Sequence, residues 1–321
     1  MRILLVKLSS MGDVVHNLPV ATDIRQEFPH AVIDWAVEPL FAPIVSLHPA
    51  VRRVYPIPLR TLKQHWWSPA RWGRFLAARK ALGEEPYDLV LDTQGLLKSA
   101  LVAKHARGPK AGFDSASARE PAASRCYTAT YRVSRNLHAV MRNRALAAAA
   151  LKYDIPQAVD YGLSGSIQSG GKCPPDVVCL TATSRTDKQW PTDAWRELLR
   201  RLCDCGARVV LPWGNESEHA ECVRIAENFD HVSIPPRAPL NEVAQWLAHA
   251  NVVVGVDTGL AHLAVALGRP TVGIYVSTQP GLTGLYGRDD SLNLGGGTRE
   301  NPAPPTVDAV WLAVKARLGT T

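Results

Sequence analysis

A single carboxylate stands near the start of the 321-residue chain, at the mouth of a predicted helix. Asp13 lies in the stretch KLSSMGDVVHNLP, which follows the apolar, strand-like run of residues 2–6. A carboxylate at the carboxyl end of a strand could take a proton from an attacking hydroxyl group, as a general base does. It could equally cap the helix that we expect to begin near Val14, and the residues leave both roles open.

A second group of polar residues lies far along the chain, in the stretch NVVVGVDTGLAH. We expect residues 251–256 to form a buried strand, followed by a turn from Asp257 to Gly259 and then a helix. The free amides and positive dipole end of such a helix suit a phosphate group, and glycine lets the backbone approach a bulky group closely. The alternative is that Asp257 or Thr258 only caps the helix. His262, taken alone, is more typical of an ordinary packed or exposed histidine.

Two further loops supply groups that suit a diphosphate and a sugar. The stretch TATSRTDKQWP follows a predicted strand and carries hydroxyl groups at Thr183 and Ser184 and an ammonium group at Lys188. Such groups could neutralise a diphosphate leaving group, although a lysine in a loop is more often a solvated charge. The stretch LPWGNESE places Glu216 and Glu218 after another strand, where one could bind ribose hydroxyls or act as a first-turn helix acid.

Several common nucleotide-binding signatures are missing from the sequence. No G-x-G-x-x-G follows the first strand, which argues against a dehydrogenase, and no G-x-x-x-x-G-K-[ST] occurs, which excludes the P-loop NTPases. No Asp-x-Asp pair is present that could hold a metal against a nucleotide diphosphate, so we expect neither a metal nor a cofactor. The charge on a leaving diphosphate would then be met by Lys188, backbone amides and Arg185.

Alternating strand and helix patterns must position these residues. Apolar, β-branched runs alternate with helix-like segments along the whole chain, which predicts parallel sheets with helices on both faces. A stretch rich in Gly, Ser and Pro at residues 155–175 marks a domain connection. We therefore expect an α/β protein with two doubly wound, Rossmann-like domains, at residues 1–153 and 176–321, joined by a linker at 154–175. The last helix of the chain could pack back on the first domain. A cleft between two such domains is the usual place for an active site.

Composition and charge limit the possible partners. Hydrophobic residues make up 46% of the chain and charged residues 20%, as in soluble globular proteins, and no stretch approaches the roughly 18 apolar residues of a membrane-spanning helix. Lys7 interrupts the first apolar run too early for a signal peptide, so we expect a cytosolic protein. Residues 1–153 hold 22 basic against 11 acidic residues, and the remainder 14 against 18. The first half is therefore expected to meet an anionic partner: nucleic acid, a phosphorylated acceptor or a membrane surface.

Six stretches of the chain together resemble glycosyltransferase family 9, the lipopolysaccharide heptosyltransferases. They are KLSSMGDVVHNLP, DTQGLLKSA, SAREP, TATSRTDKQWP, LPWGNESE and VDTGLAHLAVALGRP, in the order and at the separations of the family. The resemblance runs from Met1 to about Gly287. Within it, KSA and AREP are typical of the members that attach the first heptose rather than the second.

The resemblance implies the GT-B fold, with two domains facing each other across a central cleft, and an inverting transfer by single displacement that needs no metal. The implied donor is ADP-L-glycero-D-manno-heptose, bound by the C-terminal domain. The implied acceptor is the inner Kdo of Kdo2-lipid A, bound by the N-terminal domain during synthesis of the lipopolysaccharide inner core. The protein would then be peripheral on the cytoplasmic face of the inner membrane, whose anionic surface would be a further partner.

Site roles carry over from the family residue by residue. Asp13 resembles the catalytic base, and Lys188 resembles the lysine that neutralises the phosphates. The residues that match the donor site are Thr183, Ser184, Lys188, Glu218, Asp257, Thr258, Gly259, Leu260 and His262. The candidates for contact with the anionic acceptor are Arg60, Lys98 and Arg119. Two departures concern Ala238, where relatives can carry a methionine beside the adenine, and the single arginine at position 60, where relatives can have two.

Other interpretations remain open at this stage. Residues 60–75 mix basic and aromatic side chains in the manner of an interfacial anchor, or form a half-buried helix with its tryptophans packed under the domain. A heptosyltransferase II or another family 9 member would act on a different acceptor, and a nucleotide-sugar epimerase would turn over the donor alone. A nucleic-acid-binding protein would explain the basic half, but no recognition helix, zinc finger or RNP-type motif occurs, so we expect no nucleic-acid partner.

Overall fold

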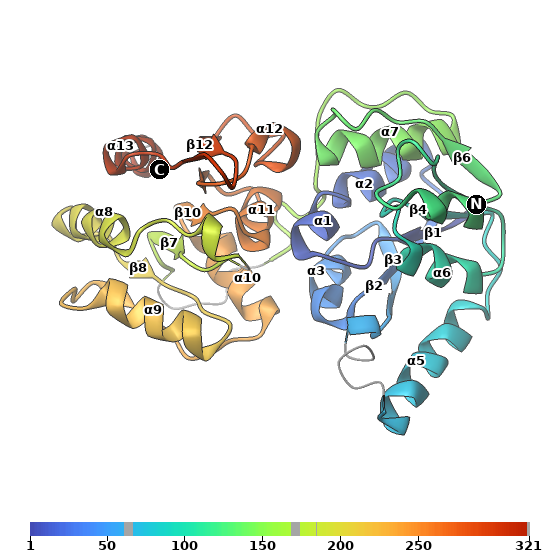
Figure 1. Cartoon of the computed structure of the whole chain (residues 1–321), viewed down its shortest axis with the longest axis horizontal. Helices are drawn as coiled ribbons and strands as arrows, with labels where there is room; N and C mark the ends of the chain where they lie inside the picture. The colour runs from blue at the N-terminus through green and yellow to red at the C-terminus, as the bar shows by residue number, and fades with distance from the viewer. Residues whose placement is uncertain (61–66, 168–173, 184, 320–321) are drawn as a thin grey trace. The chain divides into compact units, whose positions relative to one another are not determined.

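The chain forms two compact α/β units, Met1–Gly162 and Leu163–Thr321. The computed structural model describes residues 1–60, 67–167, 174–183 and 185–319. Each unit is built on its own sheet with helices on both faces (Figure 1). Within the described ranges, no helix combines the length and the apolar character that crossing a bilayer requires.

The sheet of the first unit has six strands, all parallel to their neighbours. They are β1 (Arg2–Val6), β2 (Val32–Val37), β3 (Val51–Pro56), β4 (Leu89–Asp92), β5 (Lys110–Phe113) and β6 (Ala129–Tyr131). The strand order is β3-β2-β1-β4-β5-β6, so the chain first builds outward on one side of β1 and then on the other. The order reverses between β1 and β4, and ligands of doubly wound sheets bind at the carboxyl ends of strands at such a point.

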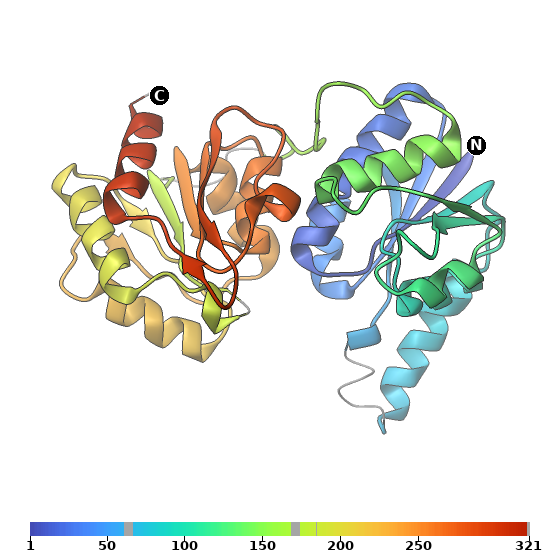
Figure 2. The same ribbon diagram turned by 45° about the horizontal axis from the view of Figure 1, so that its top comes forward.

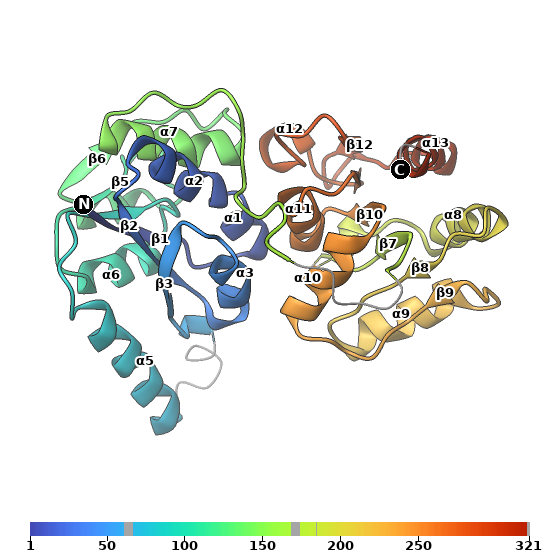
Figure 3. The same cartoon turned by 180° about the vertical axis from the view of Figure 1, so that it is seen from behind.

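Helices cover both faces of this first sheet (Figure 3). The helical segments are α1 (Met11–Val15), α2 (Leu18–Glu27), η1 (Pro39–Phe41), α3 (Ala42–Ser46), α5 (Pro69–Leu82), α6 (Leu97–His105), η2 (Pro121–Cys126) and α7 (Ala139–Leu151). Helices α2 and α7 pack together on one face, and α5 and α6 pack together on the other. Strand residues alternate between the faces, and Leu4 and Val6 of β1 belong to the core beneath α5 and α6.

A buried ion pair joins α7 to α2. The guanidinium of Arg144, which is fully buried, donates from Nε and Nη2 to the two carboxylate oxygens of Asp23, over 2.7 and 3.0 Å. Nη2 also donates to the backbone carbonyls of Pro156 and Ala158. The planar guanidinium holds all these acceptors within hydrogen-bond distance, with the N–H groups of Nη2 shared among three of them, so Arg144 fixes both helices and the chain that follows α7.

Replacing Arg144 with lysine is expected to lower the free energy of unfolding of this unit by about 2 kcal/mol. A single ammonium group cannot reproduce the fork, and buried polar groups left without a partner cost about 1–3 kcal/mol each. The measurement is equilibrium urea denaturation followed by circular dichroism. The matched control is Arg201→Lys, whose partners Glu197 and Asp308 lie at the surface, and it should change the value by less than about 0.5 kcal/mol. Equal effects of the two substitutions would contradict the role of Arg144.

The second unit repeats the same winding. Its strands are β7 (Val177–Leu180), β8 (Val209–Val210), β9 (Val232–Ser233), β10 (Val252–Val256), β11 (Thr271–Tyr275), β12 (Ser291–Gly297) and β13 (Pro302–Ala303). The order is β13-β12-β11-β10-β7-β8-β9, parallel except for the antiparallel pair β12 and β13. Here the order reverses between β7 and β10, which predicts the ligand site at the carboxyl ends of these two strands.

The helices of the second unit also divide between the two faces. They are η3 (Thr186–Lys188), α8 (Thr192–Asp204), α9 (Glu216–Ala226), α10 (Leu240–His249), α11 (Gly259–Ala266), α12 (Pro280–Thr283) and α13 (Val307–Leu318). Helices α8, α9 and α13 bury their apolar sides in one core with the strands, and α10 packs on α11. Figure 2 shows the last helix, α13, beside α8 of its own unit. Its packing on the first domain stays a prediction.

Candidate active site

The loop that carries Asp13 lies at the point where the first sheet reverses its strand order. The chain leaves β1 through residues 7–10 and enters α1, while β4 leads into the loop before α6. Side-chain hydrogen bonds join these segments. The backbone N–H of Leu8 donates to Oε1 of Gln94 over 2.7 Å, and Nζ of Lys98 donates to Oγ of Ser9 over 2.9 Å. The predicted base and one predicted acceptor residue therefore share one strand-end site.

Of the two roles that the sequence left open for Asp13, the structure shows the cap, and the role as a base stays a prediction. It is the third residue of α1, and its Oδ2 accepts hydrogen bonds from the backbone N–H and the hydroxyl of Ser10, over 3.0 and 3.1 Å. Asp13 thus caps its own helix. Nη1 of Arg119 lies 3.5 Å from the same oxygen, and 26% of the Asp13 side chain is exposed. A carboxylate that is held on one side and open to solvent can still meet a bound hydroxyl group.

The charges around Asp13 favour its ionised form. Partial burial alone would raise the pKa of Asp13, but the positive charges of Lys7 and Arg119 and the hydrogen bonds from Ser10 outweigh it, and the pKa is lowered. The carboxylate is therefore ionised at neutral pH, as a general base must be.

Lys7 is a site residue that the sequence reasoning missed. Its buried ammonium group donates to the backbone carbonyl of Thr93 over 2.8 Å and to Oδ1 of Asn143 over 3.2 Å. Burial lowers the pKa of Lys7 to about 8, even though the charges of Asp13 and Asp92 act in the opposite direction. A lysine directly after an apolar strand was the available signal, because such a position leads to the carboxyl edge of the sheet.

Buried Lys7 makes the stability of the protein depend on pH in a definite direction. The folded protein releases this proton near pH 8 and the unfolded chain only near 10.5, so unfolding takes up a proton between these values and stability rises with pH there. Methionine does not titrate. We therefore expect the free energy of unfolding of the wild type to gain about 1 kcal/mol per pH unit over Lys7→Met between about pH 8.5 and 9.5. Urea denaturation at several pH values measures this, and a constant difference between the proteins would contradict it.

The remaining predicted acceptor residue lies at the neighbouring strand ends. The backbone N–H of Arg60, which follows β3, donates to Oε1 of Glu38 over 2.9 Å, and Glu38 directly follows β2. Burial raises the pKa of Glu38, while the charges of Arg60 and Lys98 oppose the rise. Arg60, Lys98 and Arg119 thus all belong to the carboxyl edge of the first sheet. Sequence reasoning missed Glu38, although a carboxylate at a strand end was its signal.

In the second unit, Lys188 and Asp257 form an ion pair at the predicted strand ends. Lys188 ends the short η3 after β7, Asp257 follows β10, and Nζ of Lys188 lies 2.6 Å from Oδ2 of Asp257, with both side chains largely buried. The hydroxyl of Thr278, beyond β11, donates to the same oxygen over 2.9 Å, and Nε2 of His262 lies 3.9 Å from Oδ1. The sequence predicted Lys188, Asp257 and His262 as site residues but neither their pairing nor Thr278.

This cluster lies directly before the amino end of α11. Burial would raise the pKa of Asp257, but His262 and Lys188 hold it well below its usual range, so the carboxylate stays ionised. The hydroxyl of Thr183 donates to the backbone carbonyl of Asp257 over 3.1 Å, which joins the loop after β7 to the start of the helix. An ammonium group beside the positive end of a helix is an arrangement that suits a phosphate group.

Three of the other predicted donor residues lie at the amino end of α11. Thr258 is the N-cap of α11, and Gly259 and Leu260 are its first two residues. Ser184 lies outside the described residues. Arg185, expected to assist with the diphosphate, pairs with Asp187, its Nε lying 3.0 Å from Oδ1.

Glu218 acts as a first-turn helix acid in this structure. Its Oε2 accepts from the backbone N–H of Gly214 and its Oε1 from Nδ2 of Asn215, both over 2.7 Å. It lies beyond β8, the strand next to β7. Binding of ribose by Glu218 stays a prediction.

Comparison with known proteins gives one consistent result. The family model described as glycosyltransferase family 9 (heptosyltransferase) matches residues 75–304. The lipopolysaccharide heptosyltransferase 1 of Salmonella typhimurium strain LT2 is 46% identical over 293 residues, which cover 90% of this chain and 92% of that protein.

Solved structures agree with the sequence comparison. The E. coli heptosyltransferase WaaC with ADP superposes with a TM-score of 0.91 at 41% identity, over 99% of this chain and 100% of that one. The E. coli heptosyltransferase WaaC with ADP-2-deoxy-2-fluoro heptose gives 0.88 at 40% identity, over 98% and 99%. The predicted GT-B fold of two doubly wound units is thereby confirmed.

Proposed function

Because the chain belongs to glycosyltransferase family 9, the heptosyltransferases, we propose that it moves L-glycero-D-manno-heptose from ADP-heptose to the inner Kdo of Kdo2-lipid A. The donor class is supported by the ADP and the ADP-heptose analogue in the solved relatives. The observation that carries the proposal in this chain is Asp13, an ionised and partly exposed carboxylate with Lys7, Lys98 and Arg119 around its loop. A carboxylate surrounded by positive charges suits an acceptor that carries both a reactive hydroxyl group and negatively charged groups, because the carboxylate can take the hydroxyl proton while the cations bind the negative charges.

The proposed reaction is a single displacement. A hydroxyl oxygen of the Kdo attacks the anomeric carbon of the heptose, and Asp13 takes the hydroxyl proton as the new carbon–oxygen bond forms. The bond from the anomeric carbon to the diphosphate breaks on the opposite side, so the configuration inverts and ADP leaves. The positively charged side chains at the edge of the first sheet, Arg60, Lys98 and Arg119, would hold the carboxylates and phosphates of the acceptor.

The second unit would hold the leaving group. Lys188 and the first backbone amides of α11 are the groups that would meet the charge developing on the ADP diphosphate. Asp257 orients Lys188 through their 2.6 Å contact, and Thr278 and His262 in turn hold Asp257. A preorganised cation of this kind stabilises the departing charge without first having to move.

The proposed location of the protein in the cell follows from its proposed acceptor. Kdo2-lipid A is a membrane glycolipid, so we propose that the protein works as a peripheral protein on the cytoplasmic face of the inner membrane.

The decisive experiment incubates ADP-heptose, Kdo2-lipid A and EDTA with wild-type protein and with Asp13→Ala, and follows the acceptor by mass spectrometry. Addition of one heptose by the wild type alone is the expected result.

Two other results would redirect the proposal. No transfer by folded wild-type protein would point to another family 9 acceptor, beginning with a lipid A core that already carries one heptose. Conversion of the donor in the absence of any acceptor would favour an epimerase.

A further inference from the structure

Helices α5 and α6 of the first unit repeat one pattern of side chains on their outer faces. In each helix two large apolar residues stand four positions apart, and two basic residues follow at the seventh and eighth positions after the first. The residues are Trp72, Leu76, Arg79 and Lys80 in α5, and Leu97, Leu101, Lys104 and His105 in α6. This spacing puts each set of four on one stripe of its helix, since residues four and seven positions apart share a face.

The apolar members of these stripes are exposed although both helices already bury another face. Leu76 is 50% exposed and Leu101 is 54% exposed, whereas Phe75 packs against the core and Leu82 and Val102 belong to it. Single exposed apolar residues are ordinary, but a set that repeats on two helices packed against each other is a candidate interaction surface. We call the two stripes together the α5–α6 face.

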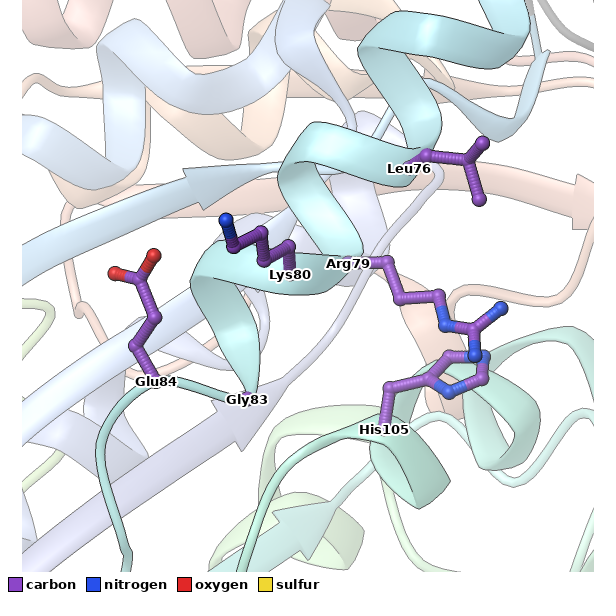
Figure 4. A pocket seen from close by; sticks show the side chains of 6 residues that line it. All are labelled: Leu76, Arg79, Lys80, Gly83, Glu84 and His105. Carbon is purple, nitrogen blue, oxygen red and sulfur yellow. The ribbon is translucent and has the colours of Figure 1, made fainter.

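A pocket joins the two helices at their carboxyl ends. It is lined by Leu76, Arg79, Lys80, Gly83 and Glu84 from α5 and the turn after it, and by His105 from α6 (Figure 4). Figure 4 shows Arg79 and His105 reaching toward each other from their two helices. Partial burial and the positive charges of Arg79 and Lys104 lower the pKa of His105. The basic groups of the α5–α6 face are therefore crowded, and a bound anion would relieve their repulsion.

The charge of this face is of one sign over a long stretch of sequence. No Asp or Glu occurs between Glu38 and Glu84, nor between Asp92 and Asp114, so neither helix carries a carboxylate. Glu84 is the acidic residue at the rim of the pocket. The next residue, Glu85, forms ion pairs with Arg2, Arg52 and Arg53.

We propose that the α5–α6 face docks on an anionic lipid bilayer. The basic side chains would contact lipid phosphates while Trp72, Leu76 and Leu101 enter the boundary between headgroups and acyl chains. Exposed apolar residues flanked by cations are typical of helices that lie in such an interface. A nucleic acid backbone would use the cations but leave the apolar stripes in water, so the apolar residues favour the bilayer.

The position of the two helices fits this partner. Helix α6 begins at Leu97, and the next residue, Lys98, reaches the loop of Asp13. One end of the α5–α6 face therefore lies beside the residues proposed to hold a glycolipid. Helix α5 stands out from the rest of its unit, with exposed Trp67 just before it (Figure 1). The inference rests on the proposed function only for the identity of that glycolipid, because binding to a bilayer needs no substrate.

The test is flotation of the full-length protein with vesicles of phosphatidylethanolamine and phosphatidylglycerol that contain no acceptor. Wild-type protein should bind these vesicles and bind pure phosphatidylcholine vesicles far more weakly. The double variant Arg79→Gln/Lys80→Gln should bind about 25-fold more weakly than wild type, since each cation near an anionic surface contributes about fivefold. Leu76→Glu/Leu101→Glu should lose at least about tenfold.

The matched control is Leu312→Glu, because Leu312 is a 65% exposed leucine on α13 of the other unit. It should bind vesicles as the wild type does. Wild-type binding by either double variant, or an equal loss in Leu312→Glu, overturns the proposal. Tighter binding of the wild type to duplex DNA than to the vesicles overturns it as well, in favour of a nucleic-acid partner.

Transfer assays separate this inference from the proposed function. With a deacylated, water-soluble acceptor, the double variants should keep the wild-type rate, because none of their four positions belongs to the candidate active site. With acceptor embedded in anionic vesicles, their rates should fall. If the wild type floats with vesicles but transfers heptose to neither acceptor, the proposed function fails and the docking surface stands.

Discussion

Replacing Asp13 with asparagine is expected to lower kcat by at least about 100-fold while the protein stays folded. Loss of a positioned general base typically costs about 10²–10⁴ in rate. Asparagine keeps a side-chain oxygen that can accept the backbone N–H of Ser10, so the cap of α1 survives while the base is lost. The measurement is the initial rate of heptose transfer at saturating donor and acceptor, with thermal unfolding followed by circular dichroism as the test of folding.

The matched control for Asp13 is Ser10→Ala. It removes the hydroxyl that donates to Oδ2 of Asp13 but leaves the carboxylate in place. We expect a stability change of about 1 kcal/mol and a change in kcat of less than about threefold. An equal loss of rate in both variants would mean that Asp13 acts through the shape of its loop and not as a base.

The ionisation of Asp13 also sets an expectation for pH. Its pKa is lower in the folded protein than the ordinary value of about 3.9, so the ionised form is favoured by folding. Its contribution to stability is therefore present above that value and is lost as the pH falls through the lower, folded pKa. We accordingly expect the rate of heptose transfer not to be limited by protonation of Asp13 at neutral pH.

Replacing Lys188 with glutamine is expected to lower kcat/KM by about 10²–10³-fold and to weaken the binding of ADP. Removing one preorganised donor from a developing negative charge has an effect of this size. The substitution also leaves the largely buried Asp257 without its 2.6 Å partner, although Thr278 and His262 stay in place. Initial rates as a function of ADP-heptose concentration give kcat/KM, and calorimetric titration gives the affinity for ADP.

A double-mutant cycle with Asp257→Asn separates the two consequences of losing Lys188. If the lysine acts on the phosphates itself, Lys188→Gln should weaken ADP binding by a similar factor in both backgrounds. If it only holds Asp257, its effect should vanish once Asp257 is replaced. The second result would contradict a direct role of Lys188 in binding the diphosphate.

Local patterns were sufficient to predict the elements that position the site. The apolar run of residues 2–6 is β1, and the run before Asp257 is β10, because strands buried on both faces appear in a sequence as short continuous apolar stretches. The turn residues after these strands then have to lie at the carboxyl edges of their sheets. This is why Asp13 and Asp257 could be named from sequence alone.

Contacts between distant residues could not be predicted in the same way. Lys188 and Asp257 are 69 positions apart, and Lys7 and Asn143 are 136 positions apart. Both contacts depend on which strands become neighbours, and a periodic pattern does not contain the strand order. Residues 60–75 show a related limit, and 61–66 among them lie outside the described residues. Phe75 packs on the core, but Trp67 and Trp72 are exposed, so these two tryptophans are not packed under the domain as one alternative expected. The interfacial anchor stays a prediction.

The central place of β1 in its sheet has a consequence for synthesis on the ribosome. β1 is the first strand to be made, yet one of its two neighbours is β4, and Leu8 meets Gln94 only after 86 further residues. At about 5–20 residues per second, the apolar strand waits on the order of ten seconds with one edge unpaired. We therefore expect this edge of β1 to be open to other contacts during the interval, and the loop of Asp13 to take its final form only after α6 has been made.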